Sequence, residues 1–170
     1  PKAQYRFELS PEQVLADRLV SWPLTRAMCS PIGDGAAAAL LCSEKVWRSL
    51  PAASRERAVQ VKASVLTGGK YRALDEPGLS RLAAQRAYAA AGVQPSQIDV
   101  AEVHDATSFC EIYQAGMLGF CETGAGGEFV GSGATALGGR IPINTSGGLV
   151  SKGHPVGATG LSMIYELTGQ

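Results

Sequence analysis

The sequence contains two histidines, and both stand where an imidazole could take part in chemistry. His104 directly follows a predicted strand of residues 98–103. His154 lies between a glycine and a proline in the stretch NTSGGLVSKGHPVGATG, residues 144–160. A positioned imidazole can act as a general base, or it can donate a hydrogen bond to developing negative charge. The sequence therefore indicates proton transfer or oxyanion stabilisation, provided that one site holds both side chains.

The residues around His154 restrict what this stretch can do. Its glycines allow the backbone to approach a ligand closely and to adopt positive φ, while Pro155 restricts the conformation of His154. A phosphate-binding loop is not supported, because Lys152 is followed by Gly153 and the pattern GxxxxGK[ST] is not satisfied. A histidine after a strand can also be a capping or packing residue, and this reading stays open beside the catalytic one.

The elements expected to position these residues alternate between strands and helices. The apolar runs predict strands at residues 34–42, 59–66, 98–103 and 141–143. Helical spacing predicts helices at residues 79–91, with Gly92 as the stop, at 156–167, and from a cap at Asp105 or Thr107 to near Gly119. Residues 124–139 are glycine-rich and are expected to form a long mobile or ligand-covering loop. The alternation predicts an α/β sandwich with a parallel or mixed sheet.

In this arrangement the two histidines lie at the same edge of the sheet. Each follows a strand and precedes a helix, and ligands of open α/β sheets bind at that carboxyl edge. The helix N-termini there offer backbone N–H groups to an anion or oxyanion. We therefore expect His104 and His154 to face one pocket. An open sheet normally has more strands than these, so the chain is expected to be a fragment of a larger protein.

Composition excludes several classes of function. Fifteen basic residues balance fifteen acidic ones, so the chain has no excess charge to attract nucleic acid or an anionic membrane surface. No apolar run is long enough for a membrane span, and the first ten residues do not resemble a signal peptide. The four cysteines form no CxxC pair, so we expect buried free thiols in a reducing cytoplasm and no metal site.

Three segments resemble the C-terminal half of the thiolase superfamily, especially its sterol-carrier-protein-x or lipid-transfer branch. Residues 144–160 are similar to the family's histidine loop, NxxGGxxxxGHPxGxxG. Residues 103–106, VHDA, stand where many thiolases have Asn-Glu-Ala-Phe and this branch has His-Asp. Residues 30–38, SPIGDGAAA, resemble the strand motif that closes the N-terminal half.

The resemblance implies a fold and a division of the chain. It implies half of a thiolase-like α/β/α sandwich with a mixed five-stranded-type sheet, here as a fragment. Residues 1–45 would be the closing segment of the N-terminal thiolase half. Residues 46–170 would be the C-terminal half, truncated before its last strands.

The resemblance also implies roles for individual residues. His154 would activate the nucleophilic cysteine and line an oxyanion hole for the thioester carbonyl, and His104 would complete that hole through a water. The remaining residues would contact the substrate, coenzyme A included, or shape the loop. The substrate-binding residues are Ser30, Ala106 and Gly153, and the loop-shaping residues are Asn144, Gly147 and Gly148. Coenzyme A would be a substrate, and no further cofactor is implied.

The sequence also departs from the family pattern. The family's nucleophilic cysteine lies in the first half of the fold, and none of the four cysteines here has its setting. The second catalytic cysteine, in a C-x-G motif, would follow Gln170. Thr107 replaces the usual phenylalanine, which leaves the acyl pocket undefined. The chain alone is therefore expected to be inactive, whereas its parent would be a 3-ketoacyl-CoA thiolase or an acetyl-CoA acetyltransferase.

Other functions stay open at this point. A retro-aldolase subunit of the same superfamily would carry a tyrosine near Ala158 and Thr159, and this chain does not. A non-catalytic acyl-CoA or lipid-binding module would lack the nucleophilic cysteine in its N-terminal half. A scaffold subunit for a small acyl-binding partner protein is the third alternative. A half fold would also leave apolar surface uncovered, so we expect a homo-oligomer.

Overall fold

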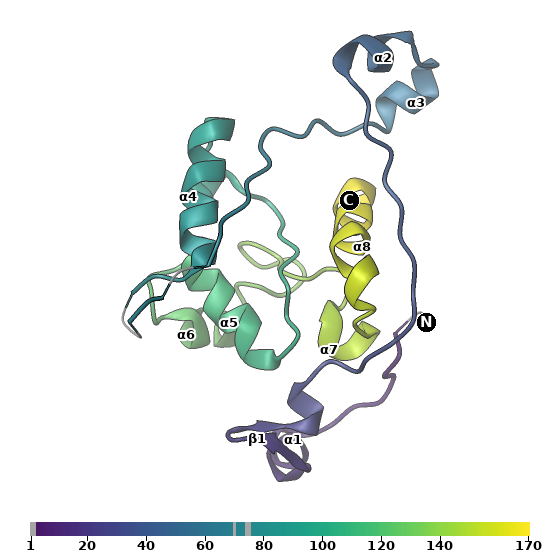
Figure 1. Ribbon diagram of the computed structural model, residues 1–170. Coiled ribbons are helices and arrows are strands. Elements are labelled where there is room, and N and C mark those ends of the chain that lie inside the picture. The colour runs from purple at the N-terminus through teal and green to yellow at the C-terminus, as the bar shows by residue number, and fades with distance from the viewer. Residues whose placement is uncertain (1–2, 70, 74–75) are drawn as a thin grey trace.

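The computed structural model describes residues 3–69, 71–73 and 76–170, and the helices from α4 onward lie in two groups. Helices α4 (Leu79–Ala91), α5 (Ser108–Met117) and α6 (Gly126–Gly131) form one group, and α7 (Gly148–Lys152) and α8 (Val156–Gly169) form the other (Figure 1). The irregular segments that carry His104 and precede His154 run between the two groups. This arrangement brings distant parts of the sequence to the centre of the molecule.

The remaining elements are short, and those that Figure 1 labels lie toward the two ends of the molecule. They are α1 (Pro11–Ala16), β1 (Leu19–Ser21), β2 (Leu24–Thr25), η1 (Arg26–Met28), α2 (Glu44–Ser49), α3 (Ala52–Glu56) and η2 (Pro95–Gln97). The strands β1 and β2 pair antiparallel. Ser10 begins α1 with a capping box completed by Gln13, and the Ser43 hydroxyl accepts the Val46 N–H at the start of α2.

The predicted helices are confirmed with small shifts at their ends. The first spans Leu79–Ala91, and Gly92 ends it in the left-handed region at φ 69°. The last begins at Val156, directly after Pro155, and continues to Gly169. Thr107 occupies the N-cap position of α5, but its side chain makes no capping hydrogen bond. The alternative cap, Asp105, accepts a hydrogen bond from the Leu149 N–H instead.

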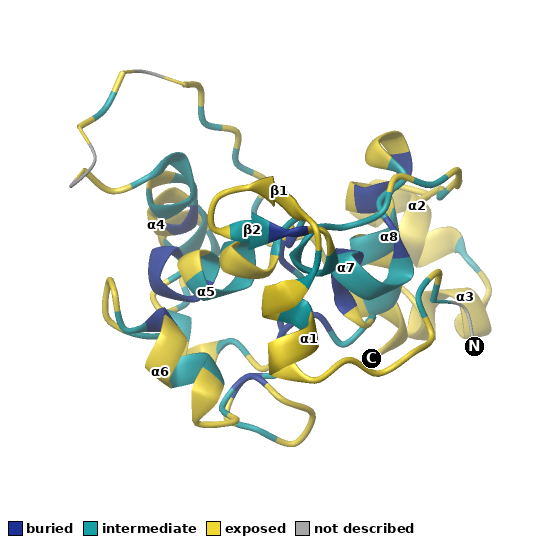
Figure 2. Cartoon of the chain, turned by 90° about the horizontal axis from the view of Figure 1, so that it is seen from below, coloured by how far each residue is buried: buried dark blue, intermediate teal, exposed yellow. Residues whose placement is uncertain are grey.

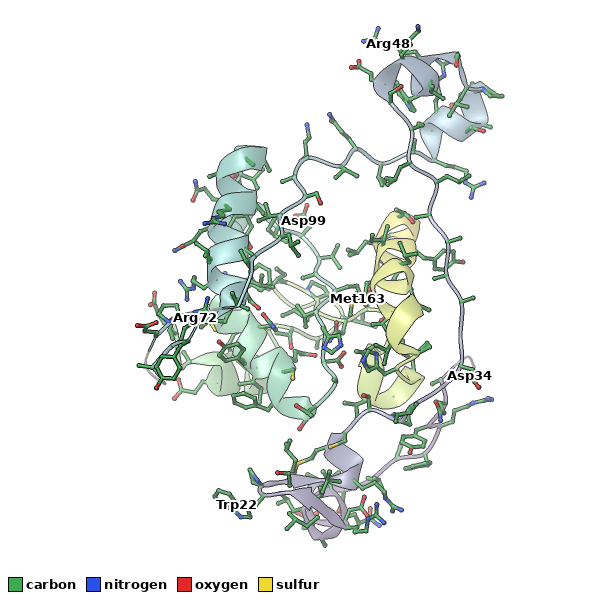
Figure 3. All side chains as sticks on the ribbon, viewed as in Figure 1. Trp22, Asp34, Arg48, Arg72, Asp99 and Met163 are labelled. Carbon is green, nitrogen blue, oxygen red and sulfur yellow. The ribbon has the colours of Figure 1, made fainter. Side chains whose placement is uncertain are left out.

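The strand predictions need correction. Within the described residues the one sheet has two strands, β1 and β2, and residues 34–42 and 59–66 are extended without a partner. Figure 3 shows side chains standing along the ribbon beyond Asp34 without an adjacent strand, and Leu40 is fully exposed. A strand requires a neighbour to receive its hydrogen bonds, and an apolar run alone does not supply one. The mix of helices and strands fits an α/β fragment, and the five-stranded sheet stays a prediction.

Residues 98–103 and 141–143 come closest to the predicted strands. They are joined by a parallel bridge between Ala101 and Ile143. The Ala101 N–H donates to Pro142 O over 3.0 Å, and the Asn144 N–H donates to Ala101 O over 2.8 Å. These two bonds fix the segment before His104 against the segment that opens the glycine loop.

The predicted loop at residues 124–139 is also corrected, because it contains helix α6. Its first residue, Gly126, packs against α5 so closely that a Cβ there would lie 2.1 Å from Ile112 O. Gly126 therefore allows α6 to pack closely against α5, because it has no side chain to separate the two helices. After α6 the chain returns to the centre, where the Ile141 N–H donates to Ala134 O over 3.0 Å.

The core is small and lies between these segments. Six buried apolar residues form it, and further apolar side chains pack around them. The six are Ala101, Val103, Ala115, Phe120, Ile141 and Ile143. In Figure 2 the buried stretches gather around α5 and α7, whereas β1 is exposed. The core thus supports the two segments that lead to the histidines.

The cysteines are unpaired, but they are less buried than predicted. Cys42 is exposed, and Cys29, Cys110 and Cys121 are half-buried. Cys42 follows an apolar run that has no partner, so nothing covers its thiol. Among the described residues, no helix combines the length and apolar character needed to cross a membrane.

Candidate active site

The two histidines lie in contact, although fifty residues separate them. The His104 Nε2 and His154 Nε2 atoms are 3.2 Å apart. The rings meet edge to face, with centroids 4.7 Å apart and planes at 78°. His104 is exposed and His154 is half-buried, so one imidazole of the pair is open to an approaching ligand. The contact brings both imidazoles together, and the single pocket that they were expected to face stays a prediction.

Asn144 links the segment before His104 to the start of the glycine loop. Its Oδ1 accepts the Val103 N–H over 2.9 Å, and its Nδ2 donates to the half-buried Glu111 carboxylate over 3.1 Å. Its φ of 57° lies in the left-handed region, which asparagine tolerates better than most residues. Asn144 therefore has the geometry of the loop-shaping residue that the sequence predicted.

Two contacts hold His154 in place. Its backbone N–H donates to Pro31 O over 2.9 Å, next to a parallel bridge between His154 and Ile32. Its ring Nδ1 lies 2.7 Å from Thr159 Oγ1, and that hydroxyl donates to Pro155 O over 3.1 Å. Because the hydroxyl donates its own proton to Pro155 O, its oxygen can only accept a hydrogen bond from the ring. The ring proton is therefore on Nδ1, and Nε2 keeps its lone pair. Thr159 is 2 % exposed and sets this tautomer.

Thr159→Val is therefore expected to release the tautomer of His154 while keeping the shape of the side chain. The Nδ1–H group would lose its acceptor, at a cost of about 1 kcal/mol for one hydrogen bond. The ring nitrogen chemical shifts of His154 should report a mixture of tautomers in this variant. Thr159→Ser should retain the Nδ1–H form, and equal spectra for both variants would contradict the role of the hydroxyl.

The predicted loop-shaping glycines adopt backbone conformations that other residues avoid. Gly147 has φ 97° and Gly148 has φ 70°. A Cβ on Gly148 would also lie 2.3 Å from Asp105 Oδ2. Gly153, at φ 98°, ends α7 and passes the chain to His154. The geometry of these three positions thus requires glycine.

Two carboxylates that sequence reasoning missed hold the loop. Glu102 accepts the Ser146 N–H over 2.9 Å and the Ser146 hydroxyl over 2.7 Å, and Lys152 Nζ lies 3.7 Å from it. Asp105 accepts the Leu149 N–H over 2.9 Å. A glutamate inside an apolar predicted strand was the available signal for Glu102. The sequence indicates Asp105 as a possible cap for the following helix and as part of the His-Asp segment, and neither pattern predicts its bond with Leu149.

Electrostatics favour a neutral His154. Burial lowers its pKa first, the adjacent His104 lowers it further, and the Asp105 charge opposes both effects. Burial raises the pKa of Asp105, and the Leu149 N–H and the Lys152 ammonium oppose that rise. The lowered pKa of His154 leaves its Nε2 unprotonated at neutral pH. In this tautomer His154 Nε2 can accept a hydrogen bond, and His104 Nε2, 3.2 Å away, can donate one.

The predicted substrate-binding residues surround the two histidines. The Ser30 N–H donates to Ala106 O over 2.9 Å, so Ser30 lies beside the segment that carries His104. Gly153 directly precedes His154 and is buried. The structure thus brings these residues to one site, and their contacts with a ligand stay predictions.

The family of the chain follows from comparison with known proteins. Residues 77–170, more than half of the chain, match a family model described as "Thiolase C-terminal domain-like". The chain belongs to the thiolase family, as its histidine loop and its His-Asp segment had indicated.

Relatives that match all or nearly all of the chain agree with this membership. The chain is 39% identical over its whole length to an acetyl-CoA acetyltransferase of Methanothermobacter thermautotrophicus, of which it covers 45%. It is 39% identical to sterol carrier protein 2 of Oryctolagus cuniculus, covering 32% of that protein. It is 33% identical to a benzoylsuccinyl-CoA thiolase subunit of Thauera aromatica, covering 43%. The chain thus spans between about a third and a half of these relatives.

A solved structure described as "Ltp2-ChsH2(DUF35) aldolase" is also similar. It is 33% identical, with a TM-score of 0.47, over 49% of this chain and 22% of that one. The family membership rests on the sequence matches alone.

Proposed function

We propose that the protein containing this chain makes or breaks a carbon–carbon bond in an acyl-CoA, as a thiolase of the 3-ketoacyl-CoA or acetyl-CoA acetyltransferase type. The observation that carries the proposal is the Nε2–Nε2 contact of 3.2 Å between His104 and His154. One lone pair and one N–H held this close together can act on one substrate, where the first removes a proton from a thiol and the second stabilises an oxyanion. The thiolase relatives support this chemistry.

In the proposed reaction a cysteine thiolate attacks the 3-keto carbonyl of the substrate. The bond between C2 and C3 breaks, an acetyl-CoA enolate leaves and takes a proton, and the acyl group stays on sulfur as a thioester. The thiolate of a second coenzyme A then attacks this thioester and leaves with the acyl group. His154 Nε2 accepts the thiol proton, and the His104 N–H donates to the oxyanion.

We place the nucleophilic thiolate outside these 170 residues, in the same longer chain or in a second one. Within the described part of the chain, no hydrogen bond joins any of the four thiols to either imidazole. Cys110 Sγ instead lies 3.2 Å from Thr107 Oγ1, and Cys42 is exposed on an extended segment. The relatives are two to three times as long as this chain, which leaves room for the missing group.

The other expectations belong to the same proposal. Coenzyme A is the substrate, no further cofactor is required, and Ser30, Ala106 and Gly153 lie along its path to the histidines. The five-stranded sheet forms when the rest of the fold supplies partners for residues 34–42 and 59–66. The exposed apolar side chains of these segments support a homo-oligomer, and a small acyl-CoA-associated partner protein is compatible with them. The free thiols support a reducing compartment such as the cytoplasm.

A series at His104 tests the proposal in the full-length protein. His104→Asn should retain thiolysis of a 3-ketoacyl-CoA within about tenfold, because an amide still donates a hydrogen bond. His104→Ala should lose about a hundredfold, the typical effect of removing one oxyanion donor. Steady-state kinetics with thermal melts as a folding control give the measurement.

Two outcomes would overturn the proposal. Equal rates for the wild type and His104→Ala would remove His104 from the chemistry. Release of a ketone or aldehyde instead of a shortened acyl-CoA, without a requirement for free coenzyme A, would identify a retro-aldolase.

A further inference from the structure

Asp105 directly follows His104 in the chain and accepts the N–H of Leu149, five residues before His154, but it has no role in the scheme above. We propose that Asp105 is the positioning residue of the site, holding His154 opposite His104 and placing a negative charge beside the pair. The inference rests on the proposed function only for the reaction that the pair performs. The placement itself follows from contacts within this chain.

The first step is the connection from Asp105 to His154. The Asp105 carboxylate accepts the Leu149 N–H over 2.9 Å, in the first turn of α7. That helix ends at Lys152, where the Gly153 N–H donates back to Leu149 O over 3.0 Å. His154 follows directly. One short helical turn therefore joins the atom that Asp105 holds to the backbone of His154.

The second step is the connection from Asp105 to His104, which precedes it in the chain. Since the two residues are adjacent, any movement of the Asp105 backbone also moves His104. The contact between Asp105 and Leu149 thus fixes the distance between the two imidazoles. Leu149 is fully buried, so its side chain anchors the helix that transmits this constraint in the interior of the protein.

The third step is the steric fit between Asp105 and Gly148. A Cβ at position 148 would lie 2.3 Å from Asp105 Oδ2 and 3.3 Å from its Cγ. Only glycine allows the carboxylate to lie so close to the start of α7. This fit gives a way to displace the carboxylate without removing it.

The fourth step concerns charge. Three influences act on the pKa of His154. Burial and the neighbouring His104 lower it, and the Asp105 carboxylate alone raises it by favouring the protonated ring. Lys152 and Glu102 act on Asp105 in turn, with opposite signs. Removal of the Asp105 charge should therefore lower the pKa of His154, a change that loss of packing at a distance would not produce.

The test is an NMR titration of the His154 ring, with steady-state thiolysis by the full-length protein as a second arm. In Asp105→Asn, which keeps the side-chain shape, His154 should titrate at lower pH than in the wild type. Gly148→Ala displaces the carboxylate and should shift the titration in the same direction. In the kinetic arm Asp105→Asn should lower kcat about tenfold or more, with KM almost unchanged.

Matched controls separate positioning from stability. Glu102→Gln alters the other carboxylate that holds this loop and should lower the melting temperature without moving the titration of His154. Gly127→Ala has free space around its Cβ position and should change neither property. If Asp105→Asn does not fold, Gly148→Ala carries the test.

Two results would overturn the inference. The first is an unchanged titration of His154 in a folded Asp105→Asn or Gly148→Ala variant. The second is an equal shift in Glu102→Gln. If the titration moves as expected but no variant or wild type performs thiolysis, the proposed function fails and the positioning role stands.

Discussion

His154→Ala is expected to reduce acyl transfer by about a thousandfold, within the range that loss of a positioned acid or base produces. The variant removes the Nε2 lone pair that accepts the thiol proton and leaves His104 without its partner at 3.2 Å. The fold should be retained. The backbone N–H at position 154 still donates to Pro31 O, and the conformation of the loop depends on its glycines.

Single-turnover acylation with a 3-ketoacyl-CoA would measure this effect in the full-length protein. His104→Asn is the matched control, because it changes the other imidazole of the pair but keeps a donor. Thermal melts should agree within a few degrees for the three proteins. Wild-type turnover by His154→Ala, or a greater loss in His104→Asn, would contradict the roles of the two histidines.

Glu102→Ala is expected to lower the free energy of unfolding by about 3 kcal/mol, the cost of leaving buried polar groups without partners. The Glu102 side chain is 1% exposed and accepts from both the backbone and the hydroxyl of Ser146. Lys152 Nζ, 3.7 Å away and also largely buried, would lose its counter-charge. Urea unfolding at neutral pH gives the measurement.

Glu44→Ala provides the control for this prediction. Glu44 pairs with Arg48, but both side chains are about seven-tenths exposed, and exposed pairs contribute less than about 1 kcal/mol. Both variants remove a glutamate carboxylate, one from a buried position and the other from an exposed one. If they destabilise the protein equally, the Glu102 contacts do not hold the loop as described.

The sequence predicted the features that local patterns determine. Helical spacing located α4 almost to the residue because Gly92 provides a left-handed stop. The glycine and proline neighbours of His154 marked the loop, and the shared position after two predicted strands indicated that His104 and His154 lie at the same edge. Each of these inferences needed only residues close together in the chain.

Other features depend on partners far apart in the sequence and could not be predicted in this way. Asp105 looked like a cap for α5, but it binds Leu149, 44 residues away. Glu102 finds Ser146 at the same separation. The apolar runs at 34–42 and 59–66 have strand composition but lack a neighbour, and a pattern of residue types does not reveal that. In each of these cases the structure depends on which residues meet across a long stretch of the chain.

The contact between His154 and Pro31 has a consequence for how activity appears during folding. The backbone of His154 is held only when the segment around Pro31 reaches the glycine loop, more than 120 positions later in the chain. A hydrogen bond from the Tyr5 N–H to Ser151 O joins similarly distant parts of the chain beside it. Contacts between such distant residues form slowly, because closing a long loop costs entropy before any bond repays it. A partly folded chain would therefore hold His154 away from His104, and the two imidazoles would meet only with the last tertiary contacts.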